Sequence, residues 1–250
     1  MEILVTNDDG WGAAGLKVLI EEIAPLGHLT VVVPDGARSG MSNAVSATQP
    51  MYLSKADPTT MGLKAEGIDC YTTNGTPSDC VKLAINVLFE EDERKIDLLV
   101  SGINHGSNAA INQIYSGTMG AVFVGAEHCI PAIGFSIDDM SQEPDFTYMR
   151  EMIGKVTRHL LDEGFRPGLC FNINAPKGTI AGLRWTRQCR SHWVKEMREI
   201  QDEQGRKCYA LSGYMVNDEP EATDTDQYAL EHGYLSIQPC KVDMTDYGAL

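Results

Sequence analysis

Two adjacent carboxylates, Asp8 and Asp9, follow a short apolar run near the start of the chain. Like charges this close repel each other, and they cost stability unless a cation lies beside them. A hard divalent ion such as Mg²⁺ or Mn²⁺ prefers oxygen ligands, which a serine hydroxyl or an asparagine amide can supply. The expected ligands of one such ion are Asp8, Asp9, Ser39 and Asn104. The alternative is that one of the two acids caps the next helix or shapes the turn at Gly10.

A second group of residues could hold phosphate. Ser116, Gly117 and Thr118 lie where a helix is expected to begin, after a loop rich in glycine. Backbone N–H groups at a helix start, with two hydroxyls, form a cradle in which the helix dipole favours an anion. A cap without a ligand is the ordinary alternative for such a tripeptide.

Other polar residues indicate less. His105 could act as an acid or base, or could be a solvated loop histidine, and Arg38 could contact phosphate or form a structural ion pair. The remaining histidines show no metal-ligand spacing. The five acids in 218–226, with no Lys or Arg among them, predict a solvated surface loop.

These candidates must be positioned by a sheet. Open parallel sheets bind ligands at the carboxyl ends of their strands, and the loops 6–10, 34–43 and 101–118 are expected to meet there. The expected strands are 3–5, 29–33, 96–100, 132–136 and 170–173, and the expected helices are 15–26, one that begins after Thr76, 118–128 and 148–161. Near-continuous apolar strands alternating with helices indicate a parallel sheet covered on both faces. The predicted fold is a Rossmann-like three-layer α/β/α core with a mostly parallel sheet.

One helix start is well marked. Thr76 is a suitable N-cap, Pro77 occupies the first helical position, and Asp79 stands where a capping box needs an acid. The alternation of strands and helices covers residues 1–180, with a hairpin expected at 51–71. The segment 181–250 is expected to belong to the same domain, as a β or irregular C-terminal extension that packs on a partner subunit.

Composition limits the function. The 250 residues include 35 Asp and Glu against 20 Lys and Arg, a net charge of −15, which argues against binding nucleic-acid polymers. Hydrophobic residues make up 43% and charged residues 22%, as in an ordinary globular protein. With no leader, no apolar run long enough to span a membrane, and seven cysteines in no metal or disulfide pattern, we expect a cytoplasmic protein that does not bind membranes.

Taken together, the motifs resemble those of the SurE family, the survival-protein-E 5′(3′)-nucleotidases. The resemblance covers most of the chain and rests on the segments 7–10, 34–43, 74–81, 101–108, 115–118, 130–132, 172–176 and 225–237. It implies a metal-dependent 5′-nucleotidase that hydrolyses nucleoside monophosphates, and it extends the expectation to 3′-nucleotides and short polyphosphate.

The resemblance also assigns roles to residues. Asp8 and Asp9 would be the catalytic acids, because they would orient or deprotonate the attacking water, and with Ser39 and Asn104 they would bind one Mn²⁺ or Mg²⁺ per subunit. The residues implied to bind phosphate are Asn43, Asn108, Ser116, Gly117 and Thr118. Members of this family form homodimers or homotetramers that exchange C-terminal segments.

The chain departs from the family pattern at several positions, among them Ala14, where the family has proline, and two alternative functions remain. Ala110 and Val124 replace a glycine and a glutamate of the family pattern, which affects the expected shape of the pocket rim. A receiver-type signalling domain also places paired acids after its first strand, but it needs a later aspartate and lysine that the loop after Val100 does not offer. A non-catalytic nucleotide- or phosphate-binding module is the other alternative, since phosphate cradles also serve binding.

Overall fold

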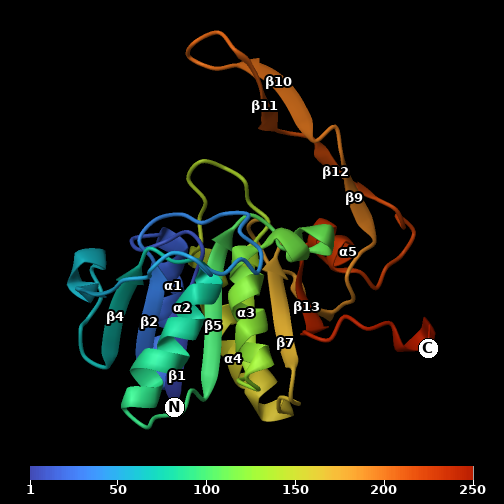
Figure 1. Cartoon of the computed structure of the whole chain (residues 1–250). Coiled ribbons are helices and arrows are strands. Elements are labelled where there is room, and N and C mark those ends of the chain that lie inside the picture. The colour runs from blue at the N-terminus through green and yellow to red at the C-terminus, as the bar shows by residue number, and fades with distance from the viewer. Residues whose placement is uncertain (250) are drawn as a thin grey trace.

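The computed structural model describes residues 1–249 and is built around one nine-stranded sheet (Figure 1). The strand order is β3-β4-β2-β1-β5-β6-β7-β13-β8. Six neighbouring strands run parallel: β4 (Ile68–Thr73), β2 (His28–Pro34), β1 (Glu2–Thr6), β5 (Leu98–His105), β6 (Ala132–Ile137) and β7 (Leu169–Ala175). At one edge β3 (Leu53–Ala56) is antiparallel to β4; at the other, β13 (Tyr234–Lys241) is antiparallel to β7 and parallel to β8 (Gly182–Trp185).

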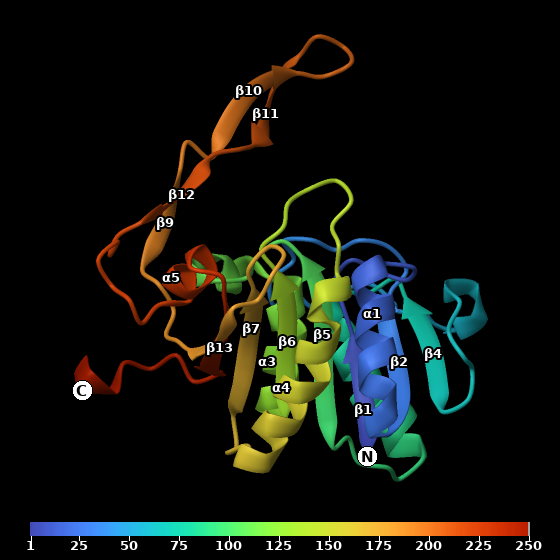
Figure 2. The ribbon, with the colours of Figure 1, turned by 180° about the vertical axis from the view of Figure 1, so that it is seen from behind.

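Helices cover both faces of the sheet. In front, in Figure 1, lie α2 (Pro77–Leu83, continued by a π-helical segment, Ala84–Phe89) and α3 (Gly117–Glu127); behind it, in Figure 2, lie α1 (Ala14–Ile23) and α4 (Arg150–Glu163). Side chains alternate along each strand, so Ile3 and Val5 join the core on one face while Leu4 joins the core on the other. The predicted three-layer α/β/α fold is confirmed.

The capping box before α2 forms as predicted. The Thr76 hydroxyl accepts a hydrogen bond from the Asp79 N–H at 3.1 Å, and the Asp79 carboxylate accepts one from the Thr76 N–H at 2.9 Å. Pro77 occupies the first helical position. These local signals are independent of tertiary contacts, which is why the sequence alone predicts them.

One strand is longer than expected. The apolar pattern predicts a strand that ends at Val100, but β5 continues to His105 with a shift in register between Ser101 and Asn104. The polar residues pair with β6, where Asn104 lies opposite Ser136. Backbone ladder hydrogen bonds do not depend on side-chain polarity, so a polar segment extends the strand when a neighbour is present. Asn104 therefore lies on a strand instead of a free loop.

The segment 51–71 contains the antiparallel pair β3 and β4, and β4 also pairs with β2. These strands therefore extend the main sheet at its edge. The segment 181–250 likewise contributes two strands to this sheet, β8 near its start and β13, which ends at Lys241. Leu235 and Ile237 of β13 are buried in the core. The predicted extension 181–250 therefore supplies part of the same sheet and core as residues 1–180.

Between β8 and β13 the chain forms an arm that rises away from the sheet (Figures 1 and 2). We define the arm as residues 191–217; it pairs β9 (Ser191–Val194) with β12 (Tyr214–Asn217) and β10 (Met197–Gln201) with β11 (Lys207–Leu211). The helix α5 (Asp226–Glu231) leads the chain back to β13. Within residues 1–249, no helix combines the length and the apolar character that crossing a membrane requires.

Candidate active site

The loop after β1 and the loop after β2 lie against each other at the carboxyl edge of the sheet. The Arg38 N–H donates to the Asp8 carbonyl oxygen at 2.6 Å. Gly10 has a φ of +88°, and a Cβ placed there would lie 2.8 Å from the carbonyl carbon of Gly36. Only glycine permits both this conformation and this approach.

Asn7 shapes the turn that carries the two acids. Its amide donates to the Gly10 carbonyl at 3.1 Å and accepts from the Gly10 N–H at 3.2 Å. The N-cap of α1 is Ala13, which makes no side-chain cap. The side chains of Asp8 and Asp9 therefore neither cap the helix nor make the hydrogen bonds that close this turn, so that alternative is wrong. Sequence reasoning missed the role of Asn7. An asparagine three residues before a glycine is nevertheless a recognisable turn signal, because its side chain can hydrogen-bond to the backbone of the turn.

Asp8 is buried against the N-terminus of α3. Its carboxylate accepts a hydrogen bond from the Thr118 hydroxyl at 2.7 Å. A Cβ added to Gly117 would lie 3.0 Å from the Cβ of Asp8, so the helix start packs directly on this acid. The structure thus brings together the predicted metal and phosphate groups, from loops 110 residues apart in the chain.

Asp9 is half-buried and faces the end of β5. Its carboxylate accepts from the His105 N–H at 3.4 Å. The N–H₂ group of Asn104 donates to the Gly106 carbonyl oxygen at 2.7 Å. The amide oxygen of Asn104 makes no hydrogen bond within residues 1–249 and is therefore available to a ligand. The Nε2 atom of His105 is buried and has no partner in the same range.

Both acids carry negative charge that no ion pair within residues 1–249 offsets. Burial, and then repulsion from Asp9, raise the pKa of Asp8 to about 6, against the Thr118 hydrogen bond that lowers it. Burial also raises the pKa of Asp9, although the His105 N–H opposes this. No Lys, Arg or His of residues 1–249 forms an ion pair with either acid. Two oxygen-rich anions without a counter-charge fit a hard divalent cation.

The described residues contain no cluster of three or more His, Cys, Asp or Glu that could hold a metal. A cation here would therefore need neutral oxygen ligands beside the two acids. Asn104 offers one, and Ser39 is exposed on the loop directly after Arg38, whose N–H bonds to Asp8. The sequence predicts that Arg38 either contacts phosphate or forms a structural ion pair. Its side chain pairs with Asp35 at 2.9 Å, so this structure shows the ion pair.

The remaining phosphate candidates are placed differently. Ser116 caps α3 by accepting from the Met119 N–H at 3.0 Å. Asn108 is buried, and its amide donates to the Ser136 hydroxyl at 2.8 Å. Asn43 is exposed and lines a cavity of about 340 Å³ with Gln113 and other residues; it makes no hydrogen bond to the two acids. Its place in the phosphate site stays a prediction.

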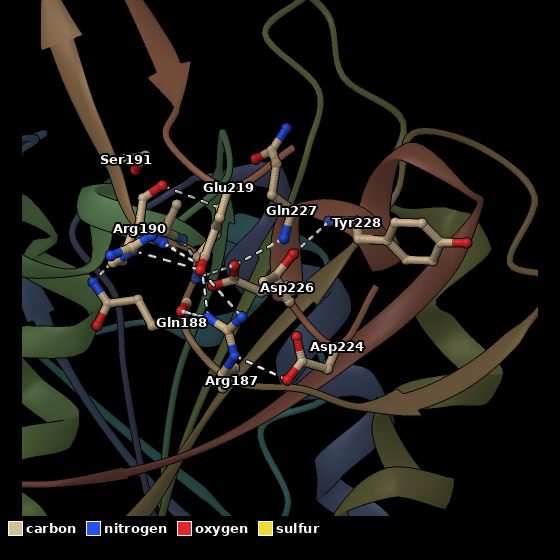
Figure 3. A network of polar contacts seen from close by, with 12 residues as sticks. Arg187, Gln188, Arg190, Ser191, Glu219, Asp224, Asp226, Gln227 and Tyr228 are labelled. Carbon is tan, nitrogen blue, oxygen red and sulfur yellow. Dashed lines mark hydrogen bonds and ion pairs between the residues drawn. The ribbon is translucent and has the colours of Figure 1, made fainter. Parts of the chain in front are cut away.

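The acids of 218–226 are not all solvated, so that expectation is wrong. Asp226 is fully buried, and Glu219 is half-buried between Arg187, at 2.6 Å, and Arg190, at 3.5 Å (Figure 3). These partners lie about 30 residues earlier in the chain, at the base of the arm. The run of acids therefore ties the arm to the core, which only the spatial arrangement reveals.

Comparison with known proteins identifies the family. Residues 3–195 match the family described as "Survival protein SurE". The chain is 42% identical to "5′-nucleotidase SurE" of Christiangramia forsetii, covering 97% of this chain and 92% of that protein, and 40% identical to "5′-nucleotidase SurE" of Bacteroides fragilis, covering 98% and 93%. The crystal structure of the SurE protein from Aquifex aeolicus matches with a TM-score of 0.82 and 29% identity, over 100% of this chain and 97% of that one. The chain belongs to the SurE family.

Proposed function

We propose that this protein is a metal-dependent 5′-nucleotidase that hydrolyses nucleoside monophosphates to nucleoside and phosphate. The observation that carries the proposal is the acid pair Asp8 and Asp9, which no ion pair within residues 1–249 offsets and of which Asp8 lies directly against the N-terminus of α3. The relatives named 5′-nucleotidase SurE support the same activity. We extend the proposal to 3′-nucleotides and short polyphosphate as further substrates, which the resemblance to the family implies.

The residues that would hold the divalent cation are Asp8, Asp9, Ser39 and Asn104. When bound, the cation supplies positive charge that attracts phosphate oxygens and acidifies water. The residues that would bind the phosphate are Ser116, Gly117 and Thr118 at the start of α3, with Asn108 and Asn43 nearby. Backbone N–H groups at a helix start stabilise negative charge on phosphate oxygens as it develops.

Asp9 is the better placed of the two acids to act as the base. It is half-buried, whereas Asp8 is buried and oriented by Thr118. In the proposed reaction a water molecule attacks phosphorus in line with the ester oxygen, and Asp9 takes its proton. The bond from phosphorus to the ester oxygen breaks with its electron pair on that oxygen, which takes a proton from solvent water to give the nucleoside hydroxyl. Asp9 returns the proton it took to solvent.

The test is hydrolysis of AMP and p-nitrophenyl phosphate by the wild type and by Asp9→Asn. We expect phosphate release with Mn²⁺ or Mg²⁺, none with EDTA, and none in the variant. Full activity of Asp9→Asn would contradict the assignment. Tight nucleotide binding without turnover at any divalent ion would instead support the non-catalytic binding module. A screen of nucleoside monophosphates against several ions would identify the substrate and the metal.

We also propose that the protein is a homodimer or homotetramer in which the arm packs on a partner subunit. The arm carries large hydrophobic side chains that are more than half exposed: Met197, Tyr209, Leu211 and Tyr214. Such residues in a projecting hairpin indicate an interface. Light scattering should give a dimer or tetramer for the wild type and a smaller species when Leu211 and Tyr214 are both replaced by serine; a monomeric wild type would contradict the proposal.

A further inference from the structure

We propose that Asp226 is a positioning residue for the phosphate site and acts through the backbone of Ala110. The inference rests on the proposed function and adds to it a residue that lies outside the three site loops. Asp226 is fully buried at the start of α5, where Thr225 is the N-cap. Its carboxylate is the point at which the base of the arm and the site loop meet.

The carboxylate of Asp226 accepts three backbone hydrogen bonds from three segments. The Ala110 N–H donates to its Oδ2 at 2.8 Å. The Cys189 and Gln227 N–H groups donate to its Oδ1 at 2.9 and 2.8 Å. Figure 3 shows Asp226 beside Gln227 and below Glu219, at the base of the arm. One oxygen thus serves Cys189, just before the arm, and α5, and the other serves Ala110 alone.

Ala110 has a conformation that needs such support. Its φ is +53°, in the left-handed region that alanine disfavours. Its carbonyl oxygen accepts from the Gln188 amide at 2.9 Å, so side chains near the arm's base hold it from both sides. Strained backbone of this kind persists where the surroundings determine it, and it concentrates at functional sites.

The position of Ala110 in the chain connects it to the site. It follows Asn108 by two residues and begins a 3₁₀ helix, Ala110–Tyr115, that leads directly to Ser116, the N-cap of α3. The next N–H, that of Ile111, donates to the Ser191 hydroxyl at 3.2 Å. A shift at Ala110 would therefore move both the Asn108 loop and the start of α3, which packs on Asp8.

The test is Asp226→Asn. Asparagine has one acceptor oxygen, and two of the three N–H donors face the Oδ1 side, so its N–H₂ group would face the Ala110 N–H. We expect kcat/KM for p-nitrophenyl phosphate to fall about tenfold, and the inhibition constant of inorganic phosphate to rise by a similar factor. The matched control is Asp224→Asn, which alters a surface pair with Arg187 and should change neither value.

A second substitution separates positioning from a general structural role. Glycine adopts the left-handed conformation freely, so Ala110→Gly should restore at least half of the logarithmic loss in the Asp226→Asn background. A merely structural role would lower the melting temperature without this rescue. Wild-type kinetics in folded Asp226→Asn, or no recovery in the double variant, would overturn the proposal.

Two further measurements cover the other outcomes. If circular dichroism shows that Asp226→Asn does not fold, Gln188→Met removes the donor to the Ala110 carbonyl at similar volume. This variant should give a smaller loss of kcat/KM, which Ala110→Gly should again reverse, and unchanged kinetics would overturn the proposal.

If the wild type releases no phosphate, the proposed function fails, and the positioning role is then tested by calorimetry of inorganic phosphate binding. Weaker binding by Asp226→Asn supports the positioning role, whereas equal binding or none in the wild type overturns it.

Discussion

Two acidic regions of this protein have opposite electrostatic surroundings. At the carboxyl edge of the sheet, Asp8 and Asp9 have no cationic partner in residues 1–249, and the pKa of Asp8 is raised to about 6 by burial and by its neighbour. At the base of the arm, hydrogen bonds from Arg187 and from the Arg190 N–H lower the pKa of Glu219 to about 2. A carboxylate charge therefore destabilises the fold at Asp8 and Asp9 and stabilises it at Glu219.

The difference separates function from structure. A carboxylate that is paired within its own chain needs no ligand, whereas an acid pair held without a counter-charge costs stability until a cation arrives. The Glu219 and Asp226 region ties the arm to the core. The Asp8 and Asp9 region holds two carboxylates that no ion pair within residues 1–249 offsets, and so it is the better candidate for catalysis.

The largest expected effect is on activity. Replacing Asp8 with Asn should reduce metal-dependent phosphate release about 10³-fold, because a ligand oxygen and its charge are both lost. The measurement is kcat/KM for AMP at saturating Mn²⁺, with Asp224→Asn as the surface control. A loss of kcat/KM below about tenfold in Asp8→Asn would contradict the view that the acid pair acts in catalysis while the acids at the base of the arm are structural.

The next effect is on the pH dependence of stability in EDTA. Asp8 has a higher pKa folded, about 6, than its ordinary value of 3.8, so the folded state binds more protons between these values. Its contribution, about 3 kcal/mol in full, is present below about pH 4 and is lost as the pH rises through 6, with about 2 kcal/mol of the loss between pH 4.5 and 7.5. Urea unfolding at pH 4.5 and 7.5 should show this loss in the wild type and not in Asp8→Asn. Parallel pH profiles of the two proteins would contradict the raised pKa.

A smaller effect should follow from Gly117→Ala. The added Cβ would lie 3.0 Å from the Cβ of Asp8 and 3.2 Å from the ring of Pro77, so these neighbours must shift by a few tenths of an ångström. We expect kcat/KM to fall about tenfold with a weaker response to Mn²⁺, while the better helix propensity of alanine keeps the melting temperature nearly unchanged. An unchanged Mn²⁺ titration would show that α3 does not position Asp8.

The smallest effect should come from Glu219→Gln. The pair with Arg187 is half-exposed, so its loss should lower the melting temperature by about 2 °C or less, and kcat/KM should stay within twofold. Because the pKa of Glu219 is lowered, its contribution is present above pH 4.5 and is lost as the pH falls toward 2, the opposite sense to Asp8. Thermal unfolding at pH 3 and 7 measures this, and a large loss of activity would contradict the purely structural role.

Much of the site was predictable because its signals are local. The acid pair follows a strand, and the tripeptide Ser116, Gly117 and Thr118, proposed to bind phosphate, opens a helix, so each could be recognised within a few residues. The contact between Asp8 and Thr118 was predictable only in outline, because the sheet order brings these segments together. The exposed position of Asn43 and the engagement of Asn108 with Ser136 were not predictable, since nothing nearby in the chain specifies these side-chain directions.

Hydrophobic periodicity, the capping box and turn chemistry determine the strands, the helices and the α/β class from the sequence alone, because they act within one element or between adjacent ones. The tertiary structure decides which acids lie beside arginine and which do not, because Coulomb forces and burial depend on distance in space. The net charge of −15 therefore says little by itself. Its meaning for Asp8, Glu219 and Asp226 comes from the fold. The fold gives Asp8 no ion pair within residues 1–249, pairs Glu219 with Arg187, and gives Asp226 three backbone hydrogen bonds.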